Sequence, residues 1–327
     1  MKYLNIIIIL LFTANLKAQS YPPPAGQEGS TAIPADSDIF LSWATGINLE
    51  RGFVDISNPD FEDQGSNRAS FGEAEDALGT PTNTPVSFGD AGVAILTFDT
   101  PIANGSGFDF AVFENAFSDT FLELALVEVS SDGENYFRFP AHSETQTETQ
   151  VGGFGAVDAR FINNLAGKYR ALFGTPFDLS DLDEDPLLDK NNITHVKLID
   201  VVGSIDPEFA SFDAFGNAIN DPFPTPFFSG GFDLDAIGVI NQQTLSLREE
   251  ELNSMTIYPN PTADFIQIKT TQQIQRIDVY SRAGRLVKQF ENSVDKDRFD
   301  VSDLPVGMYL IKVSTDRKSS LLKLIKT

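Results

Sequence analysis

Residues 122–129 read LELALVEV, a short apolar run of the kind that forms a buried β-strand. Similar runs occur on both sides of it, at residues 93–98, 108–113, 195–202 and 232–240. Clusters of Gly, Pro, Asn and Asp separate these runs, and no long stretch keeps the 3.6-residue period of a helix. The pattern predicts an all-β protein whose larger domain is an antiparallel β-sandwich of the jelly-roll type.

The composition of the 327-residue chain excludes several classes of protein. It contains 23 Lys and Arg, 47 Asp and Glu, 2 His and no Cys. Without Cys there is no disulfide framework, no zinc–thiolate site and no catalytic thiol. The formal net charge of −24 argues against nucleic acid and anionic membranes as partners, because both would repel the chain.

The N-terminal segment predicts export from the cytoplasm. Residues 1–18 combine Lys2, an apolar run and a small residue, Ala18, at the end. This order is typical of a cleaved secretory signal peptide. The apolar run is shorter than the roughly 20 residues that cross a bilayer, and no later stretch is long enough, so we expect no transmembrane segment.

Charge also separates two domains in the rest of the chain. Residues 19–254 contain 39 acidic and 9 basic residues, whereas residues 255–327 contain 8 acidic and 12 basic ones. Such a change between neighbouring segments indicates two domains with different roles. The predicted parts after the signal peptide are an acidic cargo domain at 19–245, a linker at 246–254 and a C-terminal module at 255–327.

The C-terminal module alternates apolar and polar residues in short runs separated by turns, which predicts a small Ig-like β-sandwich. It contains YPNP at 258–261, IDVY at 277–280, LPVGMYL at 304–310 and KLIKT at 323–327. In this order, and at the C-terminus, these motifs resemble the type A sorting domain of type IX secretion substrates. The resemblance implies that the type IX secretion machinery is the partner of this module. It also implies that the cargo is carried across the outer membrane and then released or attached to surface lipopolysaccharide.

Two resemblances concern the cargo domain. VEVSSDGENYF at 127–137 resembles the strand–turn–strand of discoidin-like, galactose-binding-like sandwiches. FDFAVFEN at 108–115, DVVGSI at 200–205 and SGGFDLDAIG at 229–238 resemble a family of secreted bacterial surface proteins of unsettled function, over residues 77–241. Relatives are associated with outer-membrane nutrient uptake, so the resemblance implies capture of an extracellular ligand, either a glycan or a nutrient such as a corrinoid.

Acidic residues inside the predicted strands are candidate metal ligands. A buried carboxylate is costly unless it is paired or binds a cation, and the cargo domain has too few basic residues to pair with most of its acids. Ca²⁺ takes 6–8 oxygen ligands and suits such sites. We therefore predict calcium at a subset of these residues, with turn capping or a solvated face as the alternative: Asp109, Glu114, Asn115, Asp233 and Asp235.

A second candidate calcium site is an acidic loop. Asp181, Asp183 and Asp185 alternate like the first ligands of an EF-hand. Pro186 stands where the EF-hand has Gly, and Asn192 stands where it has the bidentate Glu. A solvated acidic loop is therefore the alternative.

Candidate ligand-binding residues are aromatic. Trp43 is the single Trp of the chain. The Pro-rich segment 220–231 carries Phe223, Phe227 and Phe228, and a stiff loop cannot easily bury all three rings. These rings could form the rim of a ligand site, or a lid over the end of the sandwich.

No motif for an enzyme occurs in the sequence. There is no G-x-S-x-G, H-E-x-x-H, P-loop or dinucleotide-binding fingerprint, so we assign no catalytic residue. The sequence predicts a secreted, calcium-stabilised, non-enzymatic binding protein. The alternatives are a surface hydrolase that uses strand-end carboxylates and an adhesive or structural surface protein.

Overall fold

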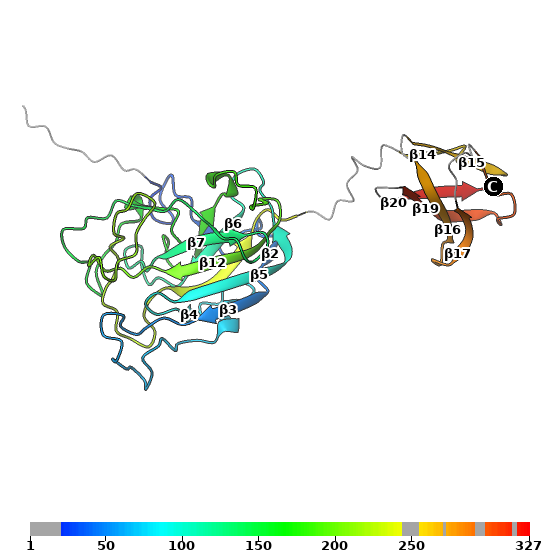
Figure 1. Ribbon diagram of the computed structural model, residues 1–327. Helices are drawn as coiled ribbons and strands as arrows, with labels where there is room; N and C mark the ends of the chain where they lie inside the picture. The colour runs from blue at the N-terminus through cyan, green and yellow to red at the C-terminus, as the bar shows by residue number, and fades with distance from the viewer. Residues whose placement is uncertain (1–20, 244–254, 271–272, 292–297, 316–318) are drawn as a thin grey trace, which may run out of the picture. The chain divides into compact units, whose positions relative to one another are not determined.

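The computed structural model describes residues 21–243, 255–270, 273–291, 298–315 and 319–327 (Figure 1). The chain divides into two compact units between Gln243 and Thr244. The predicted signal peptide and the predicted linker lie outside the described residues.

The first unit contains two antiparallel sheets, and several of their strands are labelled in Figure 1. The first sheet has the order β1 (Ile33–Pro34), β11 (Phe173–Phe177), β6 (Phe110–Glu114), β13 (Asp233–Val239) and β2 (Ser42–Trp43), with β4 (Val86–Ser87) also paired to β13. The second has the order β3 (Gly46–Glu50), β5 (Val93–Ile102), β12 (Ile193–Asp200), β7 (Ala125–Ser130) and β8 (Phe137–Arg138). A separate pair is formed by β9 (His142–Ser143) and β10 (Ile162–Asn163).

The main core lies between the two sheets. It includes Phe110 and Ile237 from the first sheet, and Leu96, Val127 and Leu198 from the second. Apolar contacts between the inner faces of two sheets define a β-sandwich. Within the described residues the helical elements are short 3₁₀ turns: η1 (Ala74–Ala77), η2 (Ala159–Phe161) and η3 (Leu179–Asp181). The predicted all-β fold is confirmed.

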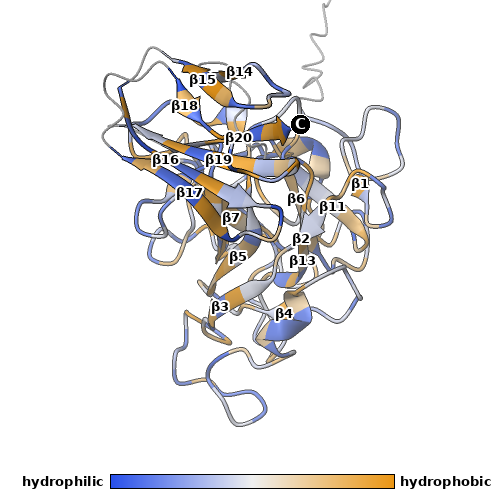
Figure 2. Ribbon diagram, turned by 90° about the vertical axis from the view of Figure 1, so that its right-hand side faces the viewer, coloured by the Kyte–Doolittle hydropathy of each residue, from blue (hydrophilic) through white to orange (hydrophobic). Residues whose placement is uncertain are grey.

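The strands differ in how many faces they bury. In β5, Ala94 and Leu96 are buried while Ile95 is only half-buried, the alternation of a strand with one covered face. Every residue of β6, β7 and β13 is buried. Loops cover the second face of these strands, which explains why their sequences are apolar without interruption. Figure 2 shows apolar residues in strands such as β5 and both apolar and hydrophilic residues in the loops.

The second unit is also a pair of antiparallel sheets. One has the order β14 (Thr256–Tyr258), β15 (Phe265–Lys269) and β18 (Phe299–Asp300). The other has the order β17 (Leu286–Glu291), β16 (Ile274–Ser281), β19 (Gly307–Thr315) and β20 (Ser319–Lys326). A cluster that includes Ile266, Val279 and Ile311 joins them.

The motifs at the two ends of this unit are in contact. The Asn260 side chain donates from Nδ2 to the Lys323 carbonyl at 2.8 Å, and the Ile325 backbone N–H donates to Asn260 Oδ1 at 2.8 Å. The two hydrogen bonds attach the first turn to the last strand. No helix in the described part of the chain has the length and apolar character needed to cross a membrane.

Candidate functional site

A pocket of about 250 Å³ opens among three loops of the first unit. These are the loops β6–β7, β9–β10 and β12–β13. Phenylalanine rings from all three loops line it, and two carboxylates lie among them. The lining includes Phe117, Phe121, Phe154, Phe227, Glu123 and Asp233.

The four rings form a continuous row, which we call the phenylalanine rim (Phe117, Phe121, Phe154 and Phe227). Neighbouring ring centroids lie 5.8 Å, 6.4 Å and 5.7 Å apart along the row. Phe117 and Phe154 are 82% and 81% exposed. Rings as exposed as these contribute little to the stability of the fold, because they are not buried in the core. Clustered exposed rings beside a pocket are typical of a binding surface.

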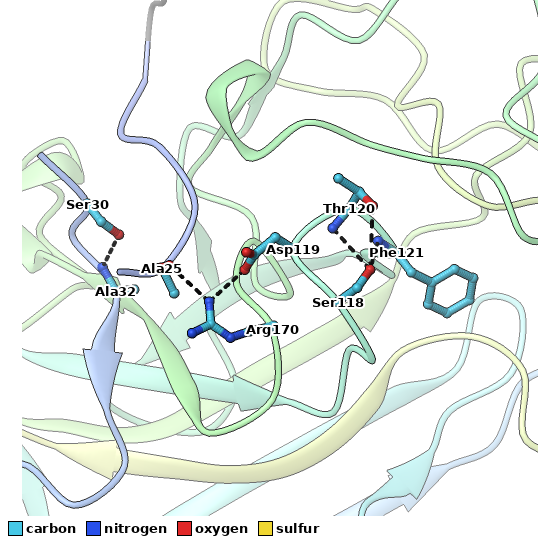
Figure 3. Close-up of polar contacts among 8 residues, drawn as sticks. All are labelled: Ala25, Ser30, Ala32, Ser118, Asp119, Thr120, Phe121 and Arg170. Atoms are coloured by element: carbon cyan, nitrogen blue, oxygen red, sulfur yellow. Dashed lines mark hydrogen bonds and ion pairs between the residues drawn. The ribbon is translucent and has the colours of Figure 1, made fainter. Parts of the chain in front are cut away.

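The β6–β7 loop is anchored by polar contacts at Ser118 and Asp119, as Figure 3 shows. Arg170 Nη1 donates to Asp119 Oδ1 at 2.7 Å and to the Ala25 carbonyl at 2.9 Å. The Ser118 hydroxyl accepts the backbone N–H of Phe121 at 3.0 Å. The Phe121 ring points away from these polar contacts, so the contacts fix the loop and leave the ring free for the pocket.

The other two loops lie close together because of glycine. A Cβ atom at Gly153 would lie 2.2 Å from the Pro224 carbonyl oxygen. Within the β12–β13 loop, a Cβ atom at Gly230 would lie 2.3 Å from the carbonyl oxygen of Thr225. A larger residue at Gly153 would push the two loops apart, and a larger residue at Gly230 would distort the turn that carries Phe227.

Three carboxylates converge at the floor of the pocket, and we call them the floor cluster (Glu114, Glu123 and Asp233). One oxygen from each lies within 4.8 Å of the others, and the three residues are 1%, 8% and 8% exposed. Glu114 ends β6 and Asp233 begins β13, and the antiparallel pairing of these strands places them together. Glu123 arrives from the β6–β7 loop, just before β7.

Electrostatics disfavour the charged form of all three acids. Burial, followed by the neighbouring charge of Asp233, raises the pKa of Glu114 and that of Glu123 well above the usual range. Burial raises the pKa of Asp233 to about 7, against a hydrogen bond from Ser87 that lowers it. Without a cation the neutral form of these acids is therefore favoured over the charged form.

Asp109 and Asp235, two of the predicted metal ligands, lie outside the floor cluster and accept backbone hydrogen bonds. Asp109 accepts the N–H groups of Gly105 at 2.7 Å and Leu179 at 2.8 Å. Asp235 Oδ1 accepts those of Thr82 and Asn83, both at 3.1 Å. These carboxylates hold loops onto the first sheet, and calcium at either residue stays a prediction.

Asn115 follows Glu114 and donates its backbone N–H to the Asp233 carbonyl at 3.1 Å. This bond extends the β6–β13 pairing by one step. The backbone of Asn115 therefore helps to hold Glu114 and Asp233 of the floor cluster together.

The predicted acidic loop lies apart from the pocket lining. Asp181 accepts a hydrogen bond from Asn164 at 3.2 Å, and Asp185 accepts the Leu187 N–H at 2.8 Å. Asp181 and Asp183 are exposed. Within the described residues, the floor cluster is the group of three or more acids or histidines that meets metal-ligand spacing.

The predicted aromatic ligand residues separate in space. Phe227 lines the pocket, whereas Phe223 is buried and Phe228 packs on Phe71 with a centroid distance of 5.9 Å. The Trp43 and Phe113 ring centroids lie 5.6 Å apart, on the outer side of the first sheet.

Sequence reasoning missed Glu123 and three members of the phenylalanine rim. Glu123 had a signal, because it is an acid inside the apolar run at 122–129. Phe117 and Phe121 had a weaker one, since both lie among polar residues in a short loop. Phe154 lies between two glycines and had none beyond its isolation.

Fold and site together describe a two-unit β protein with a cleft-bearing sandwich and a separate C-terminal module. Residues 256–327 match the family of the secretion system C-terminal sorting domain. This match supports the predicted sorting domain and indicates a type IX secretion cargo that is secreted or displayed at the cell surface.

A solved structure described as "Biofilm associated protein - BSP domain" is similar over 72% of this chain and 48% of that chain, with 13% identity and a TM-score of 0.17. The chain thus spans about half the length of that structure, and a likeness at this TM-score carries no argument about fold or function. A search of curated proteins gave no match.

Proposed function

We propose that the first unit is a non-enzymatic binding protein that captures an extracellular glycan or small-molecule ligand at the phenylalanine rim. The observation that carries this proposal is the pocket itself, with four aromatic rings around two buried acids. Binding sites commonly combine apolar walls with a few polar groups that fix the orientation of the ligand.

The volume of the pocket limits what it can enclose. At about 250 Å³ it is smaller than the roughly 300–1,000 Å³ of sites that surround a drug-sized ligand. A single sugar ring fits such a volume, and so does one edge of a larger molecule such as a corrinoid. The exposed faces of Phe117 and Phe154 would then cover the part of the ligand that stays outside.

Delivery to the cell exterior agrees with this role. The sorting domain directs the cargo outward, where glycans and nutrients are present. Calcium stabilisation, expected from the sequence, is a separate property that capture at the rim does not require.

The test is a binding screen of the full chain against immobilised glycans and cyanocobalamin. We expect the triple variant Phe117→Ala, Phe154→Ala, Phe227→Ala to lose at least about tenfold in affinity, because each ring contact contributes about 0.5–1.5 kcal/mol. Phe215→Ala is the matched control, since Phe215 is 70% exposed and contacts His142 rather than the rim.

Equal affinity of the triple variant and the parent chain would contradict the assignment of the rim. Release of a hydrolysed product from the same panel, lost in Glu123→Gln, would favour the surface hydrolase instead. Cell attachment by the protein without binding of any panel member would favour an adhesive role.

A further inference from the structure

The floor cluster contains a buried atom that no protein group satisfies. Glu114 Oε2 accepts the Ala116 backbone N–H at 2.8 Å, but Glu114 Oε1 is buried and has no hydrogen-bond partner. Glu114 is 1% exposed. A buried carboxyl oxygen without a partner is costly, and a cation bound beside it would supply the missing partner and stabilise the charged form.

Among the described residues, no ion pair joins a basic side chain to the floor cluster. The ion pairs of residues 21–243 use other acids, namely Glu128, Asp158, Asp119 and Glu184. Three acids that approach within 4.8 Å of one another repel when charged. A cation from solution removes both the repulsion and the unpaired oxygen.

The spacing of the cluster fits Ca²⁺. Calcium–oxygen bonds of about 2.3–2.6 Å allow two ligand oxygens to lie up to about 5 Å apart across the ion. The separation of the three carboxylate oxygens falls inside this limit. When each carboxylate binds through one oxygen, the three supply three of the 6–8 oxygens that Ca²⁺ takes, and three to five positions remain for other donors.

We propose that Glu114, Glu123 and Asp233 bind one Ca²⁺ ion, and that oxygen atoms of the captured ligand complete its coordination from the pocket. The second half of this proposal rests on capture at the phenylalanine rim. Glu123 and Asp233 line the pocket, so the open positions of the ion face the same space as the rings.

The charge of the site selects the chemistry of the ligand. Three carboxylates around a divalent cation leave a net charge of about −1, inside a unit that is already strongly acidic. A second anionic group is therefore disfavoured, and neutral hydroxyl oxygens are favoured. The phenylalanine rings add an apolar wall. The fitting ligand is a neutral polyhydroxyl compound with one apolar face, which is the chemistry of a sugar ring.

The first test is calorimetric titration of the full chain with CaCl₂ alone. We expect one ion per chain with a dissociation constant of about 10⁻⁴–10⁻³ M, the range of extracellular calcium modules. Glu123→Gln should weaken binding at least tenfold, whereas Glu134→Gln, an exposed and isosteric control, should leave it unchanged. Asp233→Asn is a second variant of the cluster, and melting of each variant in EDTA establishes that it is folded.

The proposed Ca²⁺ site, the metal half of the proposal, is overturned if the parent chain binds no Ca²⁺ at 10 mM, which is about ten times the weakest expected dissociation constant. It is overturned equally if both cluster variants, folded in EDTA, bind Ca²⁺ as the parent does.

The second test repeats the screen with immobilised neutral glycans in Ca²⁺ and in EDTA. We expect capture to fall at least tenfold in EDTA and in Glu123→Gln. Capture that survives EDTA would overturn the ligand half and leave capture at the rim intact. If no neutral glycan binds, the ligand half is wrong, while the calcium titration still decides the metal half.

Discussion

Two groups of buried carboxylates lie in or next to strands of the first unit and have different numbers of hydrogen-bond donors. Asp109 and Asp235 receive backbone N–H groups from neighbouring loops. The floor cluster receives fewer, and Glu114 keeps one oxygen without a partner. The difference teaches that burial of an acid does not identify a metal site, because the supply of hydrogen-bond donors decides whether a cation is needed.

The largest expected effect concerns Asp90, a buried acid that has fewer hydrogen-bond donors than Asp109 or Asp235. It accepts one backbone N–H, from Ile56, and burial raises its pKa to about 7. In the unfolded chain its pKa is about 4. The protonated carboxyl therefore stabilises the fold fully below pH 4, and this contribution is lost as the pH rises toward 7.

The measurement is urea unfolding in EDTA between pH 4 and pH 8. Asp90→Asn mimics the protonated form, so at pH 8 we expect it to be more stable than the parent chain by up to about 4 kcal/mol, and equal at pH 4. Asp60→Asn is the exposed control and should follow the parent at every pH. A constant difference between Asp90→Asn and the parent would show that Asp90 does not titrate in this range.

The second effect tests the carboxylates that have donors. Asp109→Ala leaves three donors without an acceptor, because Asn241 Nδ2 also donates to Asp109 Oδ1 at 3.0 Å. We expect a loss of about 3 kcal/mol in the free energy of unfolding. The loss should be the same in EDTA and in Ca²⁺. A loss that occurs only in Ca²⁺ would move Asp109 into the metal-binding group.

The smallest effect tests the floor cluster, which has fewer hydrogen-bond donors. Glu114→Gln fixes this side chain in a neutral form and places an amide donor beside Glu123 and Asp233. In EDTA we expect the variant to be more stable than the parent by about 1 kcal/mol. In Ca²⁺ the order should reverse, because the parent alone gains the ion. A variant that is less stable than the parent in EDTA would mean that Glu114 is satisfied without a cation.

Part of the candidate site follows from the sequence and part does not. Glu114 and Asp233 were predicted because an acid within an apolar strand is conspicuous in one segment of sequence. Glu123 has the same local character, but its partners lie elsewhere in the chain. Phe154 has no local signal, because the sequence around a phenylalanine between two glycines does not distinguish a buried ring from an exposed one.

The sequence by itself determined the all-β class, the division by charge and the C-terminal sorting module, because these follow from periodicity, composition and short motifs. Only the tertiary structure decided which acids share a site. The pairing of β6 with β13 joins Glu114 to Asp233 across more than a hundred residues, and the fold of the β6–β7 loop adds Glu123. Such contacts depend on strand register and loop packing, which local patterns do not encode.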